Sequence, residues 1–91
     1  MVQHVDIEIR GLDSSHHAFR FETFRQARTL HINGYVKNIS SDALKIVAVG
    51  KAQDVNEFIN WCHRFFDPGS KYLQHSLQSG SIKYNDFLIM D

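Results

Sequence analysis

Cysteine, proline and net charge are all scarce in this sequence, and each scarcity excludes a class of protein. A lone cysteine, Cys62, forms neither an internal disulfide nor a thiolate metal cluster. Ten basic residues balance ten acidic ones, which argues against bulk attraction to nucleic acid or to an anionic membrane. The longest aliphatic run, residues 46–49, cannot cross a bilayer, and no targeting segment is evident. We expect a cytoplasmic protein, and in the absence of a long exposed apolar stripe we expect a monomer.

What the sequence does contain is typical of an ordinary globular protein. Its 91 residues are 43% hydrophobic and 22% charged, which excludes disorder and leaves room for one core. No internal repeat, low-complexity tract or linker divides them. We therefore expect a single domain over residues 1–91.

Hydrophobic periodicity predicts strands and helices in alternation. A period of two marks strands near residues 5–9, 32–38 and 82–90, and an apolar run marks another strand over residues 44–49. Residues 72–77 also have an extended pattern. A period of three to four marks helices over residues 18–30 and from Asp54, a candidate cap, to Phe66. The order βαββαβ predicts an α+β, ferredoxin-like sandwich, with two helices on one face of an antiparallel sheet.

Two local features refine this prediction. Residues 44–49 are apolar enough for a central strand that is covered on both faces, and Gly50 is expected to end it. His31 stands where the first helix stops, a position that usually takes glycine in the left-handed conformation.

Several short motifs follow one another in a consistent order and spacing along nearly the whole chain. Phe19-Arg20 precedes a helix with Ala27 seven positions after the arginine, and Asn38 follows Arg20 by 18 residues. The same set of motifs includes Leu30, Ile32, Gly34, Val36, Leu44, Ile46, Gly50, Phe58, Trp61, the break Pro68-Gly69-Ser70 and the segment Tyr84-Asn85-Asp86-Phe87. With these motifs the chain resembles the acylphosphatase family, small enzymes that hydrolyse carboxyl-phosphate anhydrides.

The resemblance implies a role for each of two side chains. Arg20 would bind the phosphoryl group through its planar fork, and Asn38 would orient the attacking water without ionising. Backbone N–H groups before the arginine would complete the anion cradle. The residues expected to form that phosphate-binding loop are Ser14, Ser15, His16, His17, Ala18 and Phe19. The implied ligand is a small acyl phosphate or inorganic phosphate, with no metal or organic cofactor.

The loop departs from the family pattern, and two functions stay open because of it. His16 falls near the position of the usual glycine, and the loop is one residue longer than usual. The chain is either an acylphosphatase or an inactive member of the family that binds an anion or a protein. Adjacent His16 and His17 read as a solvated loop, with lining of the phosphate pocket as the alternative. RNA binding is disfavoured because residues 44–49 lack exposed aromatic side chains.

Overall fold

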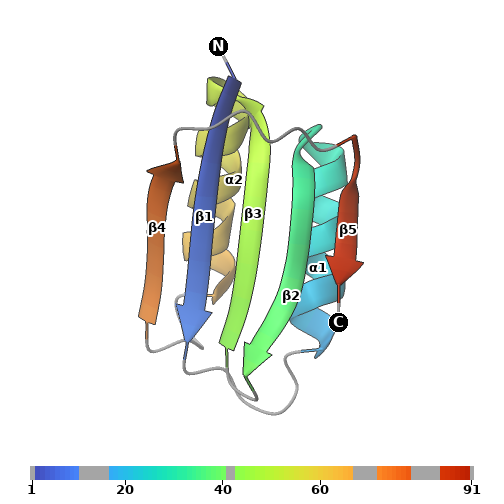
Figure 1. Ribbon diagram of the computed structural model, residues 1–91, viewed down its shortest axis with the longest axis vertical. Coiled ribbons are helices and arrows are strands. Elements are labelled where there is room, and N and C mark those ends of the chain that lie inside the picture. Colours follow the sequence, from blue (N-terminus) through green and yellow to red (C-terminus); the bar gives the residue numbers. More distant parts are fainter. Residues whose placement is uncertain (1, 11–16, 41–42, 67–71, 79–84, 91) are drawn as a thin grey trace.

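A computed structural model describes residues 2–10, 17–40, 43–66, 72–78 and 85–90 (Figure 1). The elements are β1 (Val2–Arg10), α1 (His17–Thr29), β2 (Asn33–Ser40), β3 (Ala43–Lys51), α2 (Ala52–Phe66), β4 (Tyr72–Gln78) and β5 (Phe87–Met90). The first six elements confirm the predicted βαββαβ order, and β4 corresponds to the extended segment 72–77. The closing strand is β5, which is shorter than the predicted 82–90.

The strands form one sheet in the order β4-β1-β3-β2-β5. The first four strands pair antiparallel, as predicted for a ferredoxin-like fold, and β3 occupies the centre. Short β5 adds a fifth, parallel strand beside β2, so the complete sheet is mixed. The pairing begins with Gly34 opposite Phe87 and ends with Lys37 opposite Met90.

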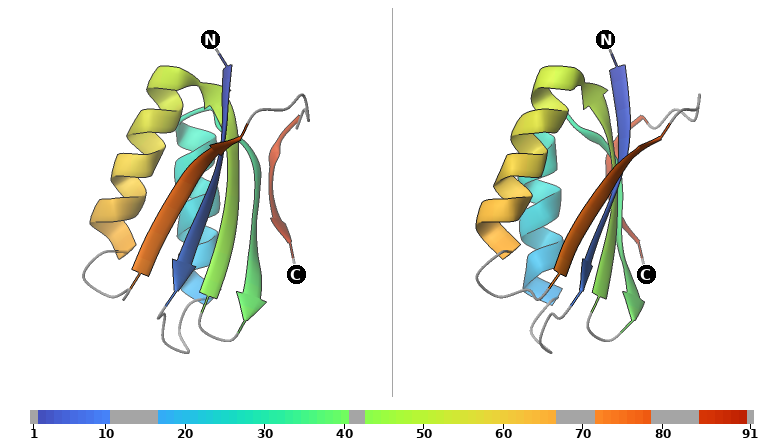
Figure 2. Two further views of the ribbon diagram at one scale, coloured as in Figure 1. Left: turned by 60° about the vertical axis from the view of Figure 1, so that its left-hand side comes forward. Right: turned by 90° about the vertical axis from the view of Figure 1, so that its left-hand side faces the viewer.

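Both helices cover the same face of the sheet (Figure 2). α1 packs on β2 and β5, and α2 packs on β1 and β3. The alternating apolar residues of the strands point into the layer between sheet and helices, where the side chains Val5, Ile7, Ile9, Val36, Leu44, Ile46, Val55, Phe58, Cys62 and Phe87 are buried. α1 and α2, the helices in the described part of the chain, are not long and apolar enough to span a membrane.

Several element boundaries differ from the predicted ones, and two of the differences concern residues singled out in the sequence. β3 continues through Gly50 to Lys51 instead of ending at the glycine, because its pairing with β1 extends to that residue. α2 begins at Ala52, so Asp54 lies inside its first turn, where its charge favours the helix dipole, and is not the cap. α2 ends at Phe66, as predicted. Residues 82–84 lie outside the described part of the chain.

α1 ends in a Schellman motif that centres on His31. The N–H of Ile32 donates to the carbonyl of Ala27 (2.8 Å), and the N–H of His31 donates to that of Arg28 (3.2 Å). His31 has φ of 59°, which confirms the predicted left-handed position. Buried Ile32 and Ala27 share the core, so the motif turns the chain directly into β2.

Replacing His31 with glycine is expected to stabilise the protein. A side chain in the left-handed region costs conformational energy that glycine avoids, so we expect a gain of about 0.5–1 kcal/mol in the free energy of unfolding. Urea denaturation measures the change, with His31→Ala as the control that keeps a Cβ. An equal gain in both variants would mean that the histidine side chain, and not φ, is the source of the cost.

Candidate active site

The two residues singled out by the sequence lie toward the same end of the molecule. β1 and β2 end there, and α1 begins there (Figure 1). Arg20 lies in the first turn of α1, and Asn38 lies near the carboxyl end of β2. The fold thus brings a fixed cation and a neutral amide from neighbouring elements to one end of the helix-covered face.

A contact with β5 ties Arg20 to the strand that carries Asn38. The Arg20 guanidinium Nη1 donates a long hydrogen bond to the carbonyl oxygen of Met90, at 3.5 Å. Met90 pairs with Lys37, the residue immediately before Asn38. Met90 thus lies between Arg20 and the residue that precedes Asn38.

Asn38 presents its amide on the helix-covered side of the sheet. Its register partner is buried Leu44, and Val36, two residues earlier on the same face, is also buried. The pairing register shifts between Asn38 and Ser40, so β2 is irregular at this point. Asn38 Oδ1 is buried, yet it accepts no hydrogen bond from the part of the protein that the structure describes. A buried acceptor without a hydrogen bond lowers the free energy of unfolding by about 1–3 kcal/mol, unless a water or ligand donates to it.

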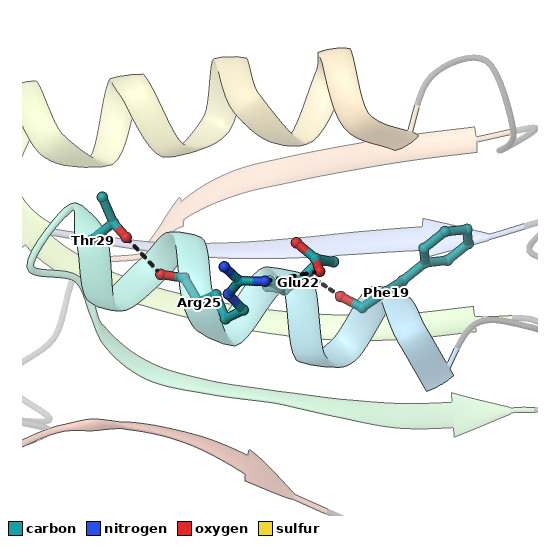
Figure 3. Close-up of polar contacts among 5 residues, drawn as sticks. Phe19, Glu22, Arg25 and Thr29 are labelled. Carbon is teal, nitrogen blue, oxygen red and sulfur yellow. Dashed lines mark hydrogen bonds and ion pairs between the residues drawn. The ribbon is translucent and has the colours of Figure 1, made fainter.

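The start of α1 favours an anion beside Arg20. The first backbone N–H groups of a helix have no partner within the helix, and they carry the positive end of its dipole. No acidic side chain lies in this first turn. Glu22, the nearest acid along the helix, contacts Arg25 at 3.5 Å (Figure 3). Within the first turn of α1, the helix dipole and Arg20 therefore both favour an anion.

The predicted phosphate-binding loop lies only partly within the described residues. His17, Ala18 and Phe19 form the first turn of α1, so their backbone belongs to the helix start and not to the preceding loop. Phe19 is half-buried against the core, and its carbonyl accepts a hydrogen bond from buried Thr23 at 2.7 Å. Ser14, Ser15 and His16 lie outside the described part of the chain, and the cradle they were expected to build remains a prediction.

Two other kinds of chemistry, thiolate attack and metal binding, find no support among the described residues. Burial raises the pKa of the Cys62 thiol far above its usual range, so it is no thiolate nucleophile at neutral pH. Among the described residues, no three His, Cys, Asp or Glu side chains gather to hold a metal ion. An open hollow of about 330 Å³ lies at the other end of α1, lined by Arg28, His31, Ile32, Asn33 and Asp86.

The contact to Met90 was absent from the sequence-based prediction. Its acceptor is a backbone carbonyl, which any residue supplies, and it lies 70 positions from Arg20. No residue pattern marks such a group. Only the placement of β5 beside α1 reveals it.

Comparison with known proteins supports the sequence-based interpretation. The acylphosphatase family model matches residues 5–89. An acylphosphatase from Photorhabdus laumondii is 33% identical over 72 residues, which cover 78% of each chain.

Solved structures agree with this match. An acylphosphatase from Coxiella burnetii superimposes with a TM-score of 0.81 at 19% identity, covering 98% of this chain and 93% of that one. Full-length HypF, solved in a phosphate- and nucleotide-bound form, superimposes with a TM-score of 0.81 at 26% identity; the match covers all of this chain and 12% of HypF. With a family model that spans nearly all of its length, this chain belongs to the acylphosphatase family.

Proposed function

We propose that this protein hydrolyses the carboxyl-phosphate bond of small acyl phosphates, with Arg20 holding the phosphoryl group and Asn38 orienting the water. The observation that carries the proposal is the buried Oδ1 of Asn38, which accepts no hydrogen bond from the described residues. Asn38 lies on β2, which pairs with the strand that contacts Arg20. An O–H of the attacking water satisfies such an acceptor and is held in one orientation by it. Family membership supports the same chemistry.

The reaction does not need a strong general base from the protein. Water attacks the phosphorus, the bond from phosphorus to the acyl oxygen breaks, and a carboxylate leaves with the bonding electrons. A phosphoryl oxygen of the substrate takes the proton from the water, so no protein side chain needs to ionise. Catalysis then depends on positioning and on stabilising negative charge, which the Arg20 guanidinium and the helix N–H groups supply.

The proposal includes a small acyl phosphate as substrate, inorganic phosphate as product, and a monomer that acts in the cytoplasm. Zero net charge fits a small ligand better than nucleic acid. The single cysteine is a free, buried thiol, which fits a reducing compartment.

Replacing Asn38 with alanine is expected to lower kcat for benzoyl phosphate by about 10²- to 10³-fold, as the loss of one preorganised polar group does. KM should change little, because Asn38 contacts the water and not the phosphate. Steady-state hydrolysis kinetics measure both constants. Asn33→Ala is the matched control, the same change at the other end of β2. An Asn38→Ala variant with unchanged kcat would contradict the assigned role.

The glycine-poor loop favours one alternative, an inactive member of the family that binds an anion. Binding and turnover separate the two functions. If phosphate raises the unfolding midpoint while benzoyl phosphate is not hydrolysed, the protein is a binding module. Turnover well above the spontaneous rate excludes that alternative.

A further inference from the structure

The edge strand β5 contacts α1 near both of its ends. Three residues of α1 spaced four apart contact β5 or the residue before it: Arg20 contacts Met90, Phe24 contacts Phe87 with ring centroids 6.5 Å apart, and Arg28 contacts Asp86, which precedes β5. Residues at this spacing lie along one side of a helix. α1 and β5 run in opposite directions, so the end of β5 meets the start of α1 (Figure 1).

The spacing of the contacting residues along α1 matches their spacing along the strand. From Arg20 to Arg28 the helix rises about 12 Å, and an extended chain from Asp86 to Met90 spans about 13 Å. An arginine therefore meets the strand at each end. A shift of β5 along α1 at the Asp86 end would displace the Met90 carbonyl that accepts from Arg20.

Asp86 is the anchor at the far end. Its carboxylate oxygens lie 3.1 and 3.4 Å from Arg28 Nη1, and Oδ1 also accepts from the N–H of Phe87 at 2.8 Å. Its carbonyl accepts from the N–H of Gly34 at 2.9 Å. Arg28 in turn lies 5.3 Å from the centre of the Phe24 ring, a cation-π contact that limits where its guanidinium sits. One residue thus joins β5 to both α1 and β2.

We propose that Asp86 and Arg28 are positioning residues, which hold β5 in place and, through the Met90 carbonyl, orient the Arg20 guanidinium for phosphate. This inference rests on the proposed function of Arg20, and it extends the site to a pair at the other end of α1. Because β5 contains four residues, it has little pairing of its own to fix its position. The anchor at Asp86 therefore matters more than it would for a long strand.

Asp86→Asn tests the pair without removing the hydrogen bond to Phe87, since the amide oxygen still accepts. We expect KM for benzoyl phosphate and the inhibition constant of inorganic phosphate to rise about two- to fivefold, with kcat within twofold. The expected rise in KM is small because an exposed ion pair stabilises the position of β5 only modestly. Its loss cannot weaken phosphate binding at Arg20 by more than that contribution. Arg28→Gln should give the same change, and the double variant should be no worse than either single one.

Arg25→Gln is the matched control, because it breaks an exposed ion pair of the same helix without touching β5. It should leave KM unchanged. If Asp86 only stabilised the fold, Asp86→Asn would lower the fraction of active protein and therefore the apparent kcat. KM would then stay unchanged. If the wild type is active and Asp86→Asn has the same KM and the same phosphate affinity, the positioning role is wrong. The proposed function would still stand.

Hydrogen exchange gives a readout that needs no turnover. Amides of residues 87–90 should exchange several-fold faster in Asp86→Asn than in the wild type, and Arg25→Gln should leave them unchanged. Equal exchange in Asp86→Asn and the wild type would overturn the anchoring of β5 by this pair. A wild type that neither hydrolyses benzoyl phosphate nor binds phosphate would instead contradict the proposed function, and the positioning role with it.

Discussion

Replacing Arg20 with alanine is expected to reduce hydrolysis of benzoyl phosphate by about 10³-fold or more, and to abolish protection of the fold by phosphate. The guanidinium is the fixed cation at the start of α1. In the proposed mechanism it stabilises negative charge on the phosphoryl oxygens as the bond to the acyl oxygen breaks. Arg20→Lys should recover only part of the loss, because an ammonium lacks the planar fork that binds two oxygens.

Initial rates of hydrolysis and thermal unfolding with and without phosphate measure these effects. Arg25→Ala removes an arginine from the same helix, away from β5, and should retain full activity. An Arg20→Ala variant that folds and keeps more than a tenth of wild-type activity would contradict the assignment of Arg20 to the phosphate.

Replacing Gly34 with alanine is expected to have the largest effect on stability, a loss of about 3 kcal/mol or more in the free energy of unfolding. Gly34 has φ of 135°, a conformation that other residues rarely adopt, and an added Cβ would lie 1.9 Å from the carbonyl oxygen of Val47. That oxygen belongs to the backbone of central β3, so it cannot move without disturbing the sheet.

Urea denaturation measures the loss, and Gly50→Ala is the matched control. At Gly50 the nearest atom to an added Cβ is the flexible Cδ1 of Ile32, at 3.1 Å, so the cost should be much smaller. Equal losses in the two variants would mean that the close approach of β2 to β3 at Gly34 does not govern stability. A loss of this size is a large share of the total for a domain of this length.

Much of the fold follows from local patterns in the sequence. Alternation of apolar residues located β1, and a continuous apolar run located the central β3. In the predicted second helix, Val55, Phe58 and Cys62, spaced three to four residues apart, are buried. The left-handed conformation of His31 was also predictable, because the residue stands at a helix end where the chain must reverse. These features depend on residues close together in sequence.

The features that escaped prediction depend on pairing between distant residues. β5 pairs with β2 in parallel, and it begins only at Phe87, because Asp86 binds its first N–H and the Arg28 side chain. No periodicity encodes the contact with Arg28, since Arg28 and Asp86 are 58 residues apart. At the candidate site, Arg20 and Asn38 were identified from shared motifs, whereas the burial of Asn38 Oδ1 depends on how β2, β3 and α1 pack.

Hydrolysis of benzoyl phosphate by the purified wild-type protein, measured over a range of inorganic phosphate concentrations, tests the central claim most directly. A site that holds the phosphoryl group between Arg20 and the start of α1 predicts turnover well above the spontaneous rate, inhibited competitively by phosphate. A folded protein whose rate equals the spontaneous one at every substrate concentration would contradict acylphosphatase activity.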